Sequence, residues 1–200
     1  MEILEILDPE YMAMRRIPQY YDYVAFKDEK VRRIIVNDII QDSTVDELIM
    51  PIIRWNEEDE AAGLAVEDRT PIRVFVNTDG GDLLVGFLVM NVFKSSKTPI
   101  HTYALAKAAS CGSIILMAGH KRFAYPFSTI LIHDGSIGVS GSSNKAKDTM
   151  KFFEEREVDV KAFYLGNSKI TDELFESKKD REWYLTGKEA LELGIVDELL

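Results

Sequence analysis

Short runs of branched residues alternate with stretches of helical periodicity along most of the chain, and this alternation constrains the fold most strongly. The runs over 31–36, 72–76 and 100–105 are rich in Val and Ile and predict β-strands. Apolar residues at helical spacing follow over 83–93 and 110–118. Because strands that alternate with helices build a largely parallel sheet, the pattern predicts an α/β fold.

Two longer segments add to the expected architecture. Thr44 lies three residues before Glu47, which is the spacing of a capping box, and Pro51 predicts a kink in the helical pattern that follows. The acidic stretch 55–71 predicts a helix end and then a loop. A long helix is expected over 145–166, where apolar residues recur at helical spacing.

Shorter elements complete the expected order. Short strands are expected over 123–125, 129–132 and 195–196, and a last helix over 187–193. The N-terminal segment 1–30 shows no clear period. The sequence contains no repeat, low-complexity tract or Pro/Ser-rich linker, so we expect a single domain over 1–200.

Charge and cysteine content exclude some functional classes. The 34 acidic and 24 basic residues give a net charge of −10, which argues against binding to nucleic acid or to an anionic membrane surface. No apolar run approaches the roughly 18 residues of a membrane span, and the acidic start Met1–Glu5 lacks the basic residues of a signal peptide. The single cysteine excludes an intrachain disulfide. We therefore expect a soluble, cytoplasmic protein.

Three blocks carry groups suited to nucleophilic hydrolysis. Gly80 and Gly81 follow a strand, where a glycine pair either makes a plain turn or lets a ligand approach the backbone. Ser110 opens a helix among small residues, as a cap or as a nucleophile beside free N–H groups. His133 ends an apolar strand, as a structural residue or as a general base. A third member, an acid that orients the imidazole, would come from the charged segment 179–185.

Other nucleophile arrangements remain open at this point. The thiol of Cys111 stands beside Ser110, and Lys107 or Lys121 could form a Ser-Lys dyad. The chain order Ser, His, acid differs from that of α/β-hydrolases, and the sequence contains no G-x-S-x-G elbow.

Four blocks in this order resemble the proteolytic subunit of the Clp protease, a serine peptidase with a ClpP-type fold related to crotonases. The resemblance covers residues 20–200. The matching blocks are Asn77-Thr78-Asp79-Gly80-Gly81, Ala108-Ala109-Ser110-Cys111-Gly112, Leu131-Ile132-His133, and Tyr184-Leu185-Thr186-Gly187-Lys188-Glu189-Ala190 followed by Gly194-Ile195-Val196-Asp197. The resemblance implies a ClpP/crotonase-like repeated β-β-α superhelix with the helix 145–166 as its handle.

The resemblance also implies a catalytic triad. Ser110 would be the nucleophile and His133 the general base. Glu182 takes the place of the family's acid, two residues before the aromatic Tyr184, although the usual residue there is aspartate. Asp180 is the fallback for this role.

The backbone N–H groups of Gly81 and Cys111 would form the oxyanion hole of such an enzyme.

Two further departures from the family pattern, beside that at Glu182, suggest a divergent or phage-type member. Asp79 replaces the family's proline, and the segment 57–70 resembles an insertion.

The family implies a serine endopeptidase that forms a homo-oligomer of two stacked seven-membered rings. A hexameric AAA+ unfoldase would feed it protein and peptide substrates. Only that partner would use ATP, because this sequence contains no P-loop, and we expect no cofactor or metal. Two alternatives are a catalytically silent ring subunit or adaptor, and a crotonase-like acyl-CoA enzyme.

Overall fold

The computed structural model describes residues 20–200, with side chains from Tyr23 onward. Most of the expected N-terminal segment 1–30, including the acidic start of the chain, lies outside the described residues. Its remainder forms helix α2 (Tyr20–Lys30), which the sequence pattern did not indicate.

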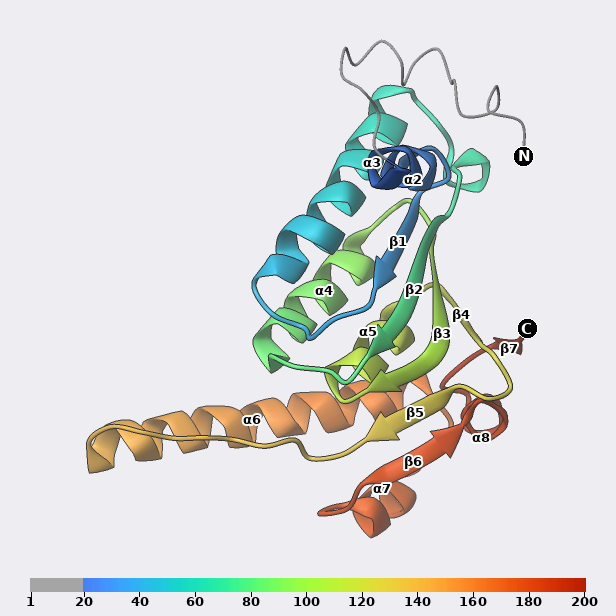
Figure 1. Ribbon diagram of the computed structural model, residues 1–200. Coiled ribbons are helices and arrows are strands. Elements are labelled where there is room, and N and C mark those ends of the chain that lie inside the picture. The colour runs from blue at the N-terminus through green and yellow to red at the C-terminus, as the bar shows by residue number, and fades with distance from the viewer. Residues whose placement is uncertain (1–19) are drawn as a thin grey trace.

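A seven-stranded sheet organises the fold (Figure 1). Five strands lie side by side and parallel in the order β1-β2-β3-β4-β7. Strand β5 pairs in parallel with the end of β3 that β4 leaves free, and β6 pairs antiparallel with β5. The bounds are β1 Arg33–Val36, β2 Ile72–Thr78, β3 Ile100–Ala109, β4 Lys121–Ala124, β5 Thr129–Ile132, β6 Trp183–Thr186 and β7 Glu198–Leu199. The predicted α/β fold with a largely parallel sheet is confirmed.

The helices surround the sheet unevenly. Helices α3 and α4 lie on one side of the N-terminal strands, whereas the long helix α6 projects from the C-terminal part (Figure 1). The bounds are α3 Met50–Ala61, α4 Leu83–Ser95, α5 Cys111–Ala118, α6 Ser143–Asn167, α7 Asp172–Lys178 and α8 Gly187–Glu192. The helix expected over 145–166 is therefore present and slightly longer, and α7 is an element that the sequence analysis missed.

Helix α5 lies at the centre of the core. All eight of its residues are buried, and it packs against β2 and β3. The contact is so close that a Cβ on Gly112 would lie 2.6 Å from the Thr78 methyl group. Alternate residues of β2 are buried on this side, whereas Phe75 on the other face stacks on Tyr103 with ring centroids 4.6 Å apart. The residue that precedes α5, Ser110, is thus attached to the most enclosed helix of the fold.

The expected start of the first long helix is wrong in detail. Thr44 makes no capping hydrogen bond, because its Oγ1 accepts from the Gln41 N–H at 3.1 Å. A π-helical turn (Val45–Ile49) follows and leads into α3. Pro51 stands at the start of α3, directly after the π-helical turn, and its missing N–H removes one hydrogen bond from a helical run that continues through both elements.

The strand expected over 195–196 is also wrong. These two residues are buried beside α8, and the strand β7 begins later, at Glu198. Asp197, the residue between them and β7, is bonded to β4 through its carboxylate, which accepts from the Arg122 N–H at 2.8 Å, and through its own N–H, which donates to the Arg122 carbonyl at 2.8 Å.

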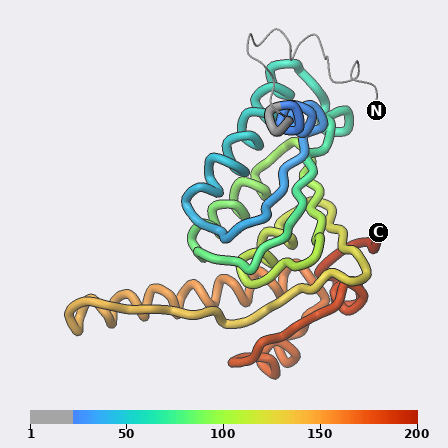
Figure 2. Tube along the Cα trace, viewed as in Figure 1, coloured from blue at the N-terminus to red at the C-terminus, as the bar shows by residue number. Residues whose placement is uncertain are grey.

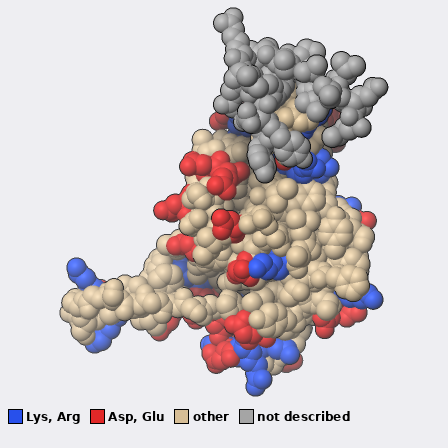
Figure 3. Space-filling view, viewed as in Figure 1, with Lys and Arg blue, Asp and Glu red and all other residues tan. Residues whose placement is uncertain are grey.

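Acidic side chains gather over α3 in Figure 3. The sequence Asn56-Glu57-Glu58-Asp59-Glu60 lies in the last turns of this helix. The helix thus runs through the first part of the stretch 55–71, and only its second part is a loop. Within residues 20–200, no helix is both long enough and apolar enough to cross a membrane.

Candidate active site

Ser110 stands at a strained turn between β3 and α5. Its backbone has φ 53° and ψ −124°, a conformation that costs a non-glycine residue about 1–3 kcal/mol and persists only where its surroundings impose it. The surroundings hold both sides of the residue. The Ser110 N–H donates to the Leu131 carbonyl at 2.9 Å, and the Ser110 carbonyl accepts from the Ser113 N–H at 2.9 Å. The backbone of Ser110 is therefore fixed at the end of β3.

His133 reaches the same place from β5. Because β3 and β5 are parallel and Ala109 pairs with Leu131, their carboxyl ends lie at the same edge of the sheet. Ser110 and His133 both line one cleft there. The Nε2 atom of His133 is buried and has no hydrogen-bond partner among the described residues. This nitrogen is thus free to meet a hydroxyl group in the cleft.

Glu182 is held opposite His133 by the pairing of β5 and β6. Trp183 pairs with Ile132 in this antiparallel ladder, so the residues just beyond them, Glu182 and His133, also face each other. The Glu182 Oε1 atom lies 3.0 Å from His133 Nδ1. Since an ionised carboxylate only accepts, Nδ1 carries the proton, and Nε2 of the neutral ring keeps its lone pair.

Asp180 does not take this position. It stands at φ 60°, and its N–H donates to the Asp134 carboxylate at 2.7 Å. No hydrogen bond or ion pair joins the Asp180 carboxylate to any residue within 20–200. The structure therefore places Glu182, not Asp180, against the His133 ring.

Two backbone N–H groups lie next to Ser110. A Cβ on Gly80 would lie only 2.6 Å from the Ser110 Cβ, and one on Gly81 would lie 2.2 Å from the Ile40 carbonyl oxygen. Both residues have positive φ, so this turn requires glycine at each position. Neither the Gly81 N–H nor the Cys111 N–H donates to another described residue. The pair is thus available to a negatively charged oxygen in the cleft.

The Cys111 thiol is unsuited to attack. Its side chain is buried, and its Sγ donates to the Gly81 carbonyl at 3.3 Å. Burial raises the pKa of the Cys111 thiol to about 11, so it remains protonated at neutral pH. This geometry favours Ser110 over Cys111 as the nucleophile.

The two lysines considered for a Ser-Lys dyad are engaged elsewhere. Lys107 forms an ion pair with Asp79 beside the glycine turn. Lys121, on β4, pairs with Glu198 at 3.1 Å. Both amino groups are thus held in ion pairs with carboxylates and neither is bonded to Ser110.

The cleft has a volume of about 1160 Å³ and separates the sheet edge from α6. Figure 2 shows the segment after β5 running along α6, and both elements contribute to the lining. Phe153, Val158 and Leu165 of α6 provide apolar lining, and Asp82, Asp134 and Glu157 provide carboxylates. An extended peptide could thus lie between α6 and the edge that carries Ser110.

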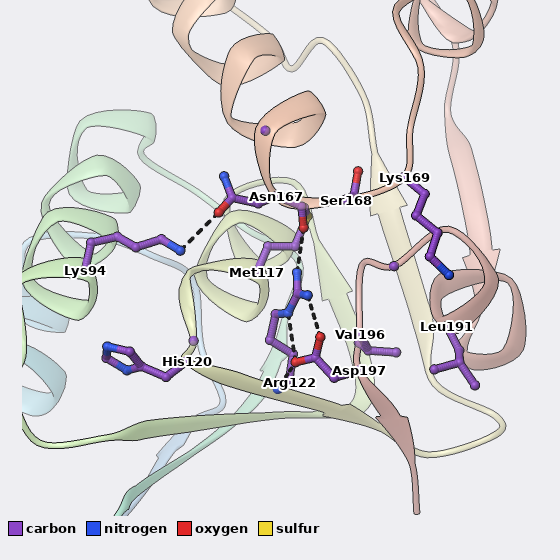
Figure 4. A pocket seen from close by; sticks show the side chains of 13 residues that line it. Lys94, Met117, His120, Arg122, Asn167, Ser168, Lys169, Leu191, Val196 and Asp197 are labelled. Carbon is purple, nitrogen blue, oxygen red and sulfur yellow. Dashed lines mark hydrogen bonds and ion pairs between the residues drawn. The ribbon is translucent and has the colours of Figure 1, made fainter. Parts of the chain in front are cut away.

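A second cavity, of about 730 Å³, contains none of these residues (Figure 4). Two of its cations, Arg122 and Lys94, are bonded to their neighbours. Arg122 donates to the Asn167 carbonyl at 2.7 Å and pairs with Asp197 at 2.5 Å, and Lys94 donates to the Asn167 side chain at 3.1 Å. These contacts join α4, β4, α6 and the C-terminal segment, which indicates a structural role.

Strand β6 is the element of the site that the sequence analysis missed. Its residues, Trp183-Tyr184-Leu185-Thr186, are aromatic or suited to strands, and this composition was the available signal.

Among residues 20–200, no three His, Cys, Asp or Glu side chains are grouped as metal ligands.

Comparison with known proteins matches residues 24–200 to the family model for Clp protease. A similar protein is the ATP-dependent Clp protease proteolytic subunit 2 of Mycolicibacterium paratuberculosis, which is 36% identical over 143 residues, or 68% of this chain and 70% of that protein. The ATP-dependent Clp protease proteolytic subunit 1 of Bacillus cereus is 29% identical over 84% of both chains. The corresponding subunit of Deinococcus radiodurans is 30% identical over 64% of both chains, slightly under two thirds of its length.

Proposed function

This chain belongs to the Clp protease family and is a ClpP-type protease, and on that premise we propose that Ser110, His133 and Glu182 hydrolyse peptide bonds through an acyl-enzyme. The observation that carries the proposal is the meeting of three strand ends at one edge. The ends of β3 and β5 bring a serine and a histidine to one cleft, and the start of β6 places a carboxylate against the histidine, with the His133–Glu182 contact at 3.0 Å.

In the first step, His133 Nε2 takes the proton of Ser110 as its Oγ attacks the peptide carbonyl carbon. The carbonyl oxygen becomes an oxyanion and accepts hydrogen bonds from the N–H groups of Gly81 and Cys111. Glu182 stabilises the imidazolium through Nδ1, which it already contacts.

In the second step, the tetrahedral intermediate collapses and the C–N bond breaks. His133 gives its proton to the leaving amine, and the acyl group remains as an ester on Ser110. Water then attacks this ester with His133 again as base, which releases the acid product and restores the serine.

The exposure of Glu182 limits how strongly its carboxylate stabilises the His133 imidazolium. The Glu182 side chain is 54% exposed, whereas that of His133 is 20% exposed. Solvent therefore screens the carboxylate, and its main effect is to fix the tautomer and direction of the ring.

The family relationship also supports an assembly and a partner. We propose that the chain forms two stacked rings of seven in the cytoplasm and receives unfolded proteins from a hexameric AAA+ ATPase, which alone uses ATP. The projecting helix α6 supports self-association, because it exposes Met150, Phe152 and Val158, the last of them 67% exposed. Sedimentation should then show a particle near fourteen subunits, and a stable monomer at all concentrations would contradict the ring.

One observation favours a second candidate, a catalytically silent ring subunit. The buried His133 Nε2 makes no hydrogen bond to Ser110 or to any other described residue. In a silent subunit this hydrogen bond between His133 and Ser110 would never form, whereas in an enzyme it forms when substrate binds.

Turnover of a fluorogenic peptide distinguishes the two candidates. The wild-type chain should hydrolyse the peptide, and Ser110→Ala should lower turnover by about 10⁴-fold or more. The matched control Ser95→Ala, at the end of α4, should retain wild-type turnover. No hydrolysis by the wild type would favour the silent subunit, and full hydrolysis by Ser110→Ala would refute the assignment of the nucleophile.

A further inference from the structure

Two buried hydroxyl groups lie behind the proposed nucleophile. The side chains of Ser113 on α5 and Tyr164 on α6 are both almost completely buried, at 0% and 2% exposed. Their oxygens are 2.5 Å apart, and Ser113 Oγ is also 2.6 Å from the carbonyl oxygen of Ser110. A chain of hydrogen bonds thus runs from α6 through α5 to Ser110.

The direction of donation in this chain is fixed by chemistry. A carbonyl oxygen can only accept, so the Ser113 hydroxyl donates its one hydrogen to Ser110. The Tyr164 hydroxyl must then donate to Ser113. Burial raises the pKa of Tyr164, so the phenol stays protonated and remains a donor throughout the working pH range.

The accepting carbonyl belongs to the same peptide unit as the Cys111 N–H. Because a peptide unit is planar, its C=O and N–H point in opposite directions, and fixing one fixes the other. Hydrogen bonds to the carbonyl also polarise the N–H and strengthen it as a donor. The two hydroxyls therefore act on one of the two proposed oxyanion donors from behind the peptide unit that carries it.

This peptide unit needs such support. Ser110 is held at φ 53° and ψ −124°, and rotation of the unit toward a relaxed conformation would turn the Cys111 N–H away from the cleft. The Ser113 N–H also donates to the Ser110 carbonyl at 2.9 Å, so the hydroxyl adds a second restraint on the same oxygen. The Tyr164 ring is itself fixed by packing against Phe163 and Phe175, with centroid distances of 6.2 Å and 5.9 Å.

We propose that Ser113 and Tyr164 are positioning residues that hold the Ser110–Cys111 peptide in its oxyanion-binding orientation and tie that orientation to helix α6. This inference rests on the proposed function, since it assigns a role to the same oxyanion hole. We call the two side chains the hydroxyl relay.

The test uses Tyr164→Phe, Ser113→Ala and the double variant in the full chain. Each single variant should lower kcat for a fluorogenic peptide by about tenfold and leave KM within about twofold, because the oxyanion forms only after substrate binds. The inhibition constant of a peptide boronic acid, which forms a tetrahedral adduct on the nucleophile, should rise by the same factor. The double variant should lose no more than the larger single loss, because the two hydroxyls act in series.

The control is Tyr103→Phe, which removes a tyrosine hydroxyl from the stacked aromatic face of the sheet. It should retain wild-type kcat and boronate inhibition. Tyr164→Phe removes a single oxygen atom, so the test does not depend on the folding of Ser113→Ala.

The relay is refuted if Tyr164→Phe keeps wild-type kcat and boronate inhibition, or if the loss is in KM alone. Additive losses in the double variant would also overturn it. These outcomes are separate from failure of the proposed function, which would show as unchanged turnover in Ser110→Ala or as no turnover by the wild type.

Discussion

Gly80 provides the sharpest structural test of the site, because it lies against the nucleophile without contributing a chemical group. In Gly80→Ala, the new Cβ would lie 2.6 Å from the Ser110 Cβ and 2.8 Å from the Ala109 carbonyl oxygen. Ordinary contact begins near 3.4 Å, so Ser110 or the turn must move by about 0.8 Å. The position also has φ +103°, where a side chain is strained.

The expected loss follows from this displacement. A misplacement of about 1 Å in a reacting group costs on the order of 10²-fold in rate, and the same shift moves the glycine turn that carries the Gly81 N–H. We expect kcat to fall about 100-fold. Backbone strain should lower the free energy of unfolding by about 1–3 kcal/mol, which leaves the protein folded.

Peptide hydrolysis and urea unfolding, measured on the same samples, test this prediction. The matched control is Gly63→Ala, which also has positive φ (+67°) but meets no atom within 4 Å. It should lose about 1 kcal/mol of stability and no activity. If folded Gly80→Ala retained kcat within threefold of wild type, the close packing of this turn against Ser110 would have no role in the reaction.

Two further predictions concern carboxylates. Glu182→Ala should lower kcat on the order of 10²-fold, since His133 would lose the group that fixes its tautomer, whereas Asp180→Asn should be nearly neutral; equal losses in a peptidase assay would contradict the choice of Glu182. Asp59→Asn should lower the free energy of unfolding by about 3 kcal/mol at pH 7, because the partly buried Arg32 would lose a bidentate, buried carboxylate partner at 2.6 Å and 2.7 Å. Hydrogen bonds from Arg32 hold the pKa of Asp59 below its usual 3.8, so this stabilisation is present above about pH 4 and is lost as pH falls through the lower folded pKa. Urea unfolding should show that the difference in free energy of unfolding between wild type and Asp59→Asn becomes smaller below pH 4. A difference that grows there would refute the contribution of the ion pair.

Local sequence patterns correctly predicted those elements whose conformation depends mainly on their own residues. The run Thr129–Ile132 forms β5 at its predicted bounds, because its branched and apolar residues suit a half-buried strand. The capping box expected at Thr44 failed, since that side chain is bound by Gln41, and the structure shows a capping box at Thr186 and Glu189 instead. Short-range spacing cannot tell which of two such threonines is free to cap.

The sequence predicts which blocks carry the residues of the site, but not the long-range pairings that bring these residues together. Ser110 and His133 follow from blocks that precede and follow recognisable strands. The preference for Glu182 over Asp180 came only from the resemblance to the family, because the register of β5 against β6, which joins segments about 50 residues apart, leaves no local signal. The hydroxyl relay depends likewise on Tyr164 packing behind α5, and a buried serine and tyrosine look like ordinary core residues in a sequence.

Peptide mapping by mass spectrometry after treatment with a fluorophosphonate tests the central claim most directly. The reagent forms a covalent bond with an activated serine, and the account predicts one adduct per chain, on the peptide that contains Ser110, with the labelling rate falling by at least 10²-fold in His133→Ala. The absence of an adduct, an adduct on another serine, or labelling at an undiminished rate in His133→Ala would contradict it.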